Sequence, residues 1–127
     1  MPESVFIVDA LRTPIGSAFR SLSDFSAAQL AGVTIEAIRK RNPVDHVNEV
    51  ILGNAVSAGT GQNLARQAAL LGGLRVTTPA FSVNHVCGAG LQAVFLGCYS
   101  ILAHKHHLVL AGGTESASRA PKAPDPS

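Results

Sequence analysis

Four short apolar runs, each closed by turn-forming residues, constrain the fold of this chain more than any other feature. They occupy residues 5–8, 50–52, 80–83 and 108–111, and segments with helical patterns separate them. Strands that alternate with helices are typical of βαβ units, in which helices on the faces of a sheet join its parallel strands. We therefore predict an α/β chain whose mostly parallel sheet is covered by helices on both sides.

The first run, Val5-Phe6-Ile7-Val8, is rich in β-branched residues and ends at Asp9, before a turn at residues 12–16. An unbroken apolar run of this length is typical of a strand that is buried on both faces. We predict further strands at the other three runs.

Three segments between the runs have helical patterns. The first begins near residue 24, where Ser23 or Asp24 can cap it, and Asn42-Pro43 ends it. Its predicted buried face carries Leu30, Val33, Thr34, Ala37 and Ile38. A short helix is predicted over residues 64–71. A third helix, over residues 87–103, is apolar nearly all round and is therefore expected to be buried.

Length and composition limit the number of domains and the kinds of partner. The chain has 127 residues, enough for one domain with one core. We assign residues 1–118 to the domain core and residues 119–127 to the start of a linker or loop. Charged residues make up only 14%, so part of the surface is expected to be buried against other protein. The net charge is +2 and the basic residues are scattered along the chain, which argues against a nucleic-acid partner.

Cysteine usage and the lengths of the apolar runs indicate the compartment. Two cysteines do not make a disulfide framework, so a reduced, intracellular setting is the simpler expectation. Cys87 and Cys98 are about three turns apart if one helix carries both, which is too far for a disulfide. No apolar run approaches the roughly 20 residues that span a bilayer. We expect a soluble, cytoplasmic protein with no membrane partner.

The segment Asn-His-Val-Cys-Gly-Ala-Gly at residues 84–90 holds the strongest candidate for chemistry. It places Cys87 between a predicted strand and a predicted helix, among residues small enough for a ligand to approach the backbone. Free N–H groups at a helix start stabilise a thiolate, as a nucleophilic cysteine requires. The same position also suits a small apolar residue in a tight turn. Position alone leaves both interpretations open.

Three other features favour structural interpretations. Cys98 lies within the apolar helix and is expected to pack as a small core residue. Three histidines at residues 104–107 lie at a helix end with no Cys or carboxylate nearby, so we expect no metal site. The glycine loop at residues 59–61 lacks the spacing and the Lys-Ser or Lys-Thr pair of a phosphate-binding loop. We predict no cofactor.

The sequence around Cys87 resembles the active-site signature of the thiolases, in which this cysteine is acylated by an acyl-CoA. The matching string is VNHVCGAGLQA at residues 83–93. Four further strings agree in order and spacing: IVDALRTPIG at 7–16, EVILGN at 49–54, GQNLARQAA at 61–69 and AGGTES at 111–116. By this resemblance, which covers nearly the whole chain, it is identified as the amino-terminal part of a thiolase.

The resemblance implies a thiolase-type layered fold and acyl transfer between coenzyme A thioesters in lipid metabolism. Cys87 would carry the acyl group both in thiolysis of a 3-oxoacyl-CoA and in synthesis from acetyl-CoA. The Cys87 amide would donate to the oxyanion. Acyl-CoA and CoA would be the substrates. The loop beside Gln62 and Arg66 would contact a second subunit of a homodimer or larger oligomer.

Parts of the thiolase pattern are missing from these 127 residues. Thiolases are several times longer and use a second catalytic cysteine, a Gly-His-Pro histidine and an Asn-Glu motif, none of which occurs here. Cys98 and His85 do not match those residues, and the family's CoA-binding loop would begin near Arg119. The isolated chain is therefore expected to be inactive. It would belong to an enzyme that was cut short or that a separate carboxy-terminal chain completes.

Two residues depart from the pattern within the matching strings. Ala89 stands where the thiolases usually have Ser, and Ala117 where they usually have Met. The alternative function is a non-catalytic, thiolase-like binding or assembly subunit. A ketoacyl synthase is disfavoured by the strings at residues 61–69 and 111–116.

Overall fold

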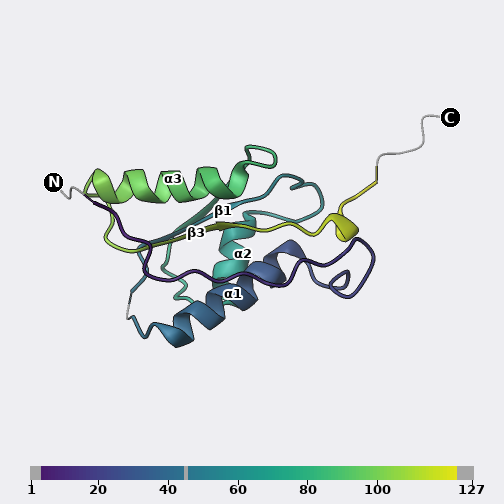
Figure 1. The fold of residues 1–127 in the computed structure, drawn as a ribbon, viewed down its shortest axis with the longest axis horizontal. Helices are drawn as coiled ribbons and strands as arrows, with labels where there is room; N and C mark the ends of the chain where they lie inside the picture. Colours follow the sequence, from purple (N-terminus) through teal and green to yellow (C-terminus); the bar gives the residue numbers. More distant parts are fainter. Residues whose placement is uncertain (1–3, 45, 123–127) are drawn as a thin grey trace.

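A computed structural model describes residues 4–44 and 46–122 of the chain. The elements are α1 (Ala27–Arg41), β1 (Glu49–Gly53), α2 (Leu64–Leu71), β2 (Ala80–Val83), α3 (Ala89–Leu102), β3 (Val109–Gly113) and a short 3₁₀ turn, η1 (Ala117–Arg119). Helix α3 covers one face of the sheet, and α1 and α2 lie on the other (Figure 1). The prediction of an α/β chain with helices on both faces is confirmed.

The three strands form a parallel sheet in the order β2-β1-β3. Gly53 at the end of β1 is in register with Val83 of β2 and with Gly113 of β3. The carboxyl ends of all three strands therefore meet at one edge, where functional groups gather in open α/β sheets. The predicted strands at residues 50–52, 80–83 and 108–111 are confirmed.

The hydrophobic core lies between β1 and the helices α1 and α2, which cover the same face of the sheet. Strand β1 is buried along its whole length, with Val50 and Ile51 no more than 1% exposed. Burying side chains of this size contributes roughly 1.5–3 kcal/mol each. Helix α1 packs on α2 through small residues: a Cβ on Gly32 would lie 2.9 Å from the Cβ of Leu71.

Helix α1 begins later and buries a different face than predicted. Its cap is Ser26, which forms a capping box with Gln29, and not Ser23 or Asp24. The buried residues are Ala27, Ala28, Ala31, Gly32 and Ile35. The prediction weighted large side chains, whereas the close approach to α2 selects small ones. As a result, Val33 is 54% exposed.

The predicted buried strand at residues 5–8 is wrong. The segment lies outside the sheet, and Phe6, Ile7 and Val8 are each at least 75% exposed. The described sheet is bounded by β2 on one side and by β3 on the other, and residues 5–8 pair with neither of these edge strands. A run of β-branched residues forms a strand only where neighbouring strands pair with it and pack its side chains, and residues 5–8 have no such pairing in the described sheet.

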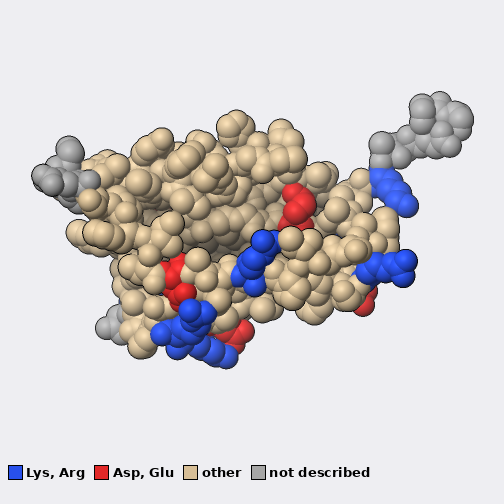
Figure 2. All heavy atoms as spheres, viewed as in Figure 1, with Lys and Arg blue, Asp and Glu red and all other residues tan. Residues whose placement is uncertain are grey.

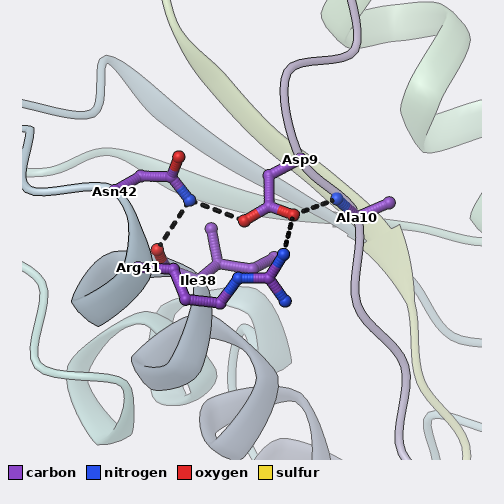
Figure 3. Close-up of polar contacts among 5 residues, drawn as sticks. All are labelled: Asp9, Ala10, Ile38, Arg41 and Asn42. Carbon is purple, nitrogen blue, oxygen red and sulfur yellow. Dashed lines mark hydrogen bonds and ion pairs between the residues drawn. The ribbon is translucent and has the colours of Figure 1, made fainter.

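The segment after residue 8 is instead attached to the end of α1 through Asp9. Its carboxylate accepts hydrogen bonds from Arg41 Nη2 at 3.0 Å and from Asn42 Nδ2 at 2.6 Å, while Asn42 also donates to the Ile38 carbonyl (Figure 3). Charge-assisted hydrogen bonds of this kind are among the stronger polar contacts. They hold the extended amino-terminal segment at this end of α1.

Helix α3 is only half buried, although its composition predicted burial on all sides. Its inner face consists of Ala89, Ala93 and Gly97, while Leu91 and Tyr99 are 61% and 57% exposed. The part of the surface over α3 shows no charged side chains (Figure 2). Small residues let α3 approach the sheet, and they leave its larger side chains on the outer face.

The predicted boundary at residue 118 falls within η1, and residues 123–127 of the expected linker lie outside the described residues. Within the described ranges, no helix is both long and apolar enough to cross a bilayer.

Candidate active site

Glycines allow the start of α3 to approach the carboxyl edge of the sheet very closely. A Cβ on Gly53 would collide with the backbone of Ala89 and would lie 2.5 Å from the nitrogen of Gly90. A Cβ on Gly113 would lie 2.9 Å from the Cα of Gly90. Distances below 3 Å leave no room for a side chain, so these glycines set the position of the helix start. The turn that carries Cys87 is thereby held at the ends of the strands.

Cys87 lies in a tight turn between β2 and α3, as predicted. Helix α3 itself begins at Ala89 with Gly88 as its cap, so Cys87 precedes the helix by two residues. The Gly88 amide donates to the His85 carbonyl at 3.0 Å, and the Ala89 amide donates to the Val86 carbonyl at 3.2 Å. The Cys87 side chain is exposed. An accessible thiol at the start of a helix is the arrangement expected of a nucleophilic cysteine.

The residue before the cysteine has an unusual backbone conformation. Val86 has a φ of +51°, which is rare for a β-branched residue and costs on the order of 1–3 kcal/mol. Its side chain is 68% exposed, so burial of that side chain does not offset the cost. The Val86 amide donates to Asn84 Oδ1 at 2.9 Å, which closes a local turn around it. Strain of this kind clusters at functional sites.

Polar side chains that follow the three strands join the strand ends to one another. After β2, Asn84 Nδ2 donates to the Ala55 carbonyl at 3.0 Å. After β1, Asn54 Nδ2 donates to the Thr114 carbonyl at 3.1 Å and to Glu115 Oε1 at 3.0 Å. After β3, Glu115 Oε2 accepts from the Ala55 amide at 2.8 Å. The Cys87 turn is therefore connected by hydrogen bonds to the residues after β1, and through them to Glu115 after β3.

The sequence of the chain matches the family described as "Thiolase, N-terminal domain" over residues 5–126. The chain belongs to the thiolase family. It is 45% identical over 121 residues to a probable acetyl-CoA acetyltransferase of Escherichia coli K12, covering 94% of this chain and 31% of that protein. It is 48% identical to the acetyl-CoA acetyltransferase of Chromobacterium violaceum, covering 92% of this chain and 30% of that protein.

A solved structure agrees with the sequence relationship. The Acat5 thiolase from Ascaris suum in complex with coenzyme A superimposes with a TM-score of 0.86 at 33% identity, over 92% of this chain and 31% of that one. The thiolase-type fold is therefore confirmed. The chain spans about 30% of the length of the curated thiolase relatives it matches.

Other residues singled out in the sequence have structural contacts. Cys98 was expected to be buried, but it is half-exposed, because only the inner face of α3 is covered. His106 Nε2 lies 2.9 Å from Glu49 Oε2, so a carboxylate does lie near the histidines, contrary to expectation. The sequence spacing hid this contact because β1 and β3 are neighbours only in the folded sheet. In the described part of the chain, no three His, Cys, Asp or Glu side chains are grouped to hold a metal ion.

The glycine loop before α2 is fixed by contacts within the chain. Gly59 and Gly61 have positive φ angles of 76° and 83°, and Gln67 Nε2 donates to the carbonyls of Thr60 and Gln62. These glycines therefore allow the backbone of the loop to adopt the positive φ angles that its turns require. The expected contact of this loop with a second thiolase subunit stays a prediction.

A cavity on the α1 side of the sheet does not contain Cys87. It has a volume of about 560 Å³ and lies between residues 11–17, α1 and the end of β3, on the opposite face of the sheet from α3.

The prediction from the sequence did not include Asn54 and Glu115 as parts of the site. The available signal was their position, since each follows the carboxyl end of a strand in a string shared with the thiolases.

Proposed function

We propose that this chain supplies the acyl-accepting thiol of a thiolase, with Cys87 as the residue that is acylated by an acyl-CoA. The observation that carries the proposal is the exposed Cys87 thiol in a strained turn at the start of α3. Family membership supports it, as do the names of the acetyl-CoA acetyltransferase relatives and the coenzyme A bound to the Ascaris thiolase. Coenzyme A thioesters are substrates in this proposal and not resident cofactors.

The chemistry follows from the properties of a thiolate. In the synthetic direction, Cys87 attacks the thioester carbonyl of an acyl-CoA, a new C–S bond forms, and CoA leaves as a thiolate that takes up a proton. The enolate of acetyl-CoA then attacks the acyl-enzyme and releases the Cys87 thiolate. Thiolysis is the reverse: Cys87 attacks the ketone carbon of a 3-oxoacyl-CoA and acetyl-CoA departs as its enolate. The Cys87 amide is the local donor to the oxyanion in each attack.

Proton transfer at the enolate and at CoA requires groups that these 127 residues do not contain. The resemblance places them in the carboxy-terminal part of a thiolase. We propose that a carboxy-terminal thiolase sequence completes the enzyme, either as a separate chain or as a continuation of this one. A cytoplasmic location, a role in lipid metabolism and assembly into a dimer or larger oligomer belong to the same proposal.

The second candidate is a non-catalytic thiolase-like subunit that binds or assembles with other proteins. The observation that favours it is Ala89 in place of the usual Ser beside Cys87. A purified chain whose Cys87 has no enhanced reactivity would support this candidate.

Limiting iodoacetamide followed by peptide mass mapping separates the two candidates. The proposal predicts that Cys87 is labelled before Cys98, because Cys87 is exposed beside a helix start and Cys98 is half-covered within α3. Labelling of Cys98 first, in chain shown to be folded by circular dichroism, would reject the assignment of Cys87.

A further inference from the structure

A continuous path of hydrogen bonds joins the Cys87 turn to the end of β3. We propose that Glu115 and Asn84 are positioning residues that fix the Cys87 turn by acting through the backbone of Ala55. This inference rests on the proposed function, because it assigns which residues hold the nucleophile in place.

The Glu115 carboxylate controls the path of the chain that leaves β1. Its Oε2 accepts from the Ala55 amide at 2.8 Å and from the Val56 amide at 3.3 Å, while its Oε1 accepts from Asn54 Nδ2 at 3.0 Å. Asn54 is 3% exposed, so this amide group cannot turn to solvent for a partner. A carboxylate can accept several hydrogen bonds at once, and bonds to a charged acceptor are the stronger kind. One side chain, two residues after the end of β3, therefore holds Ala55.

Asn84 carries that constraint to the residue before the cysteine. Its Nδ2 donates to the Ala55 carbonyl at 3.0 Å, and its Oδ1 accepts from the Val86 amide at 2.9 Å. Ala55 thus bonds to Glu115 through its amide and to Asn84 through its carbonyl. A shift of Ala55 would move both groups of the Asn84 side chain, and with them Val86.

The turn depends on being held because Val86 has a strained conformation. Its φ of +51° is unfavourable for valine, and its exposed side chain does not fix it by packing. Without the bond to Asn84, Val86 can return to a negative φ, which would re-aim Cys87 relative to the start of α3. Glu115 is itself exposed, so it adds little to the core, and its effect on Cys87 can be measured apart from global stability.

The test compares Asn84→Ala, Glu115→Ala and the double variant in the purified chain. The measured quantity is the ratio of the iodoacetamide labelling rates of Cys87 and Cys98, with Cys98 as the internal reference. Glu36→Ala is the matched control, because it removes an exposed carboxylate whose partner is Lys40 on the same helix. Hydrogen exchange at the Val86 amide reports on the turn without involving either thiol.

We expect each single variant to lower the Cys87-to-Cys98 ratio by about threefold or more, and the double variant to do no worse than the stronger single one, because coupled residues are not additive. Glu115→Ala should also speed exchange at Val86, which it does not touch, while Glu36→Ala changes neither readout. Unchanged ratios and exchange in folded variants would overturn the inference, as would effects that multiply in the double variant.

Two further outcomes keep the conclusions separate. If Glu115→Ala fails to fold, Glu115→Gln replaces it, because the Gln side chain retains an oxygen for the Ala55 amide. A Val86 exchange rate between those of the parent chain and of Asn84→Ala supports the inference. A rate equal to that of the parent chain rejects it. If the parent chain labels Cys98 first, the proposed function fails, whereas the role of Glu115 in fixing the turn is still decided by exchange at Val86.

Discussion

At the scale of single residues, Gly53 determines how closely the Cys87 turn approaches the sheet. A Cβ at this position would collide with the backbone of Ala89 and Gly90, which cannot move without displacing the start of α3. We expect Gly53→Ala to lower the free energy of unfolding by about 3 kcal/mol or more, since overpacking against backbone is costlier than against side chains.

Urea unfolding of Gly53→Ala measures this effect, and Gly112→Ala is its matched control. A Cβ on Gly112 would have Leu52 Cδ2 at 4.0 Å as its nearest neighbour, an ordinary contact, so we expect a change of about 0.5 kcal/mol or less. Equal effects of the two substitutions would show that the close approach of α3 does not explain the glycine at residue 53.

Most single residues of the candidate site could be predicted only in part. The string around Cys87 predicted an accessible thiol in a tight turn between a strand and a helix, because that arrangement has a local sequence signature, and the role of the thiol as nucleophile stays a prediction. The contacts of Asn84 with Ala55 and of Asn54 with Glu115 join residues 29 and 61 positions apart. Such contacts depend on which strands are neighbours in the sheet, and the sequence periodicity does not contain that order.

At the scale of elements, the capping box at Ser26 defines where α1 begins. Ser26 accepts from the Gln29 amide at 3.1 Å, and the Gln29 side chain accepts from the Ser26 amide at 2.8 Å. We expect Ser26→Ala to lower the free energy of unfolding by about 1 kcal/mol, because the Gln29 amide loses the side-chain oxygen that accepts from it.

Ser23→Ala provides the comparison, since the sequence predicted Ser23 or Asp24 as the capping residue. In the structure, Ser23 lies before the helix and its backbone amide bonds to the Arg20 carbonyl. Thermal or urea unfolding should show little change for Ser23→Ala. A larger loss from Ser23→Ala than from Ser26→Ala would contradict the position of the cap.

Elements with a strong local signature were predicted well. The bounds of α2 and β2 agree with the prediction at both ends, because Gly72 and the Pro79 turn are local signals. The predictions that residues 5–8 and all sides of α3 are buried were wrong. Apolar composition alone does not tell which apolar surfaces are covered by another element. The face of α1 was wrong because the contact with α2 uses Ala and Gly, which hydrophobicity patterns underweight.

At the scale of the whole molecule, the isolated chain should not turn over. Each missing acid–base partner typically contributes about 10²–10⁴-fold in rate, so acyl transfer should stop after Cys87 has reacted. A thiolysis assay with acetoacetyl-CoA and CoA on the purified chain measures this directly. Turnover comparable to that of an intact thiolase would show that this chain contains proton-transfer groups that we have not assigned.

The central claim is that Cys87 receives the acyl group. Incubation of the purified chain with acetyl-CoA, followed by peptide mass mapping in acid, tests this claim most directly. We expect slow addition of one acetyl group as a thioester on Cys87, sensitive to hydroxylamine and absent from Cys87→Ser, with Cys98 unmodified. Acetylation of Cys98 in the folded chain, or an unmodified Cys87 that iodoacetamide still labels, would contradict the account.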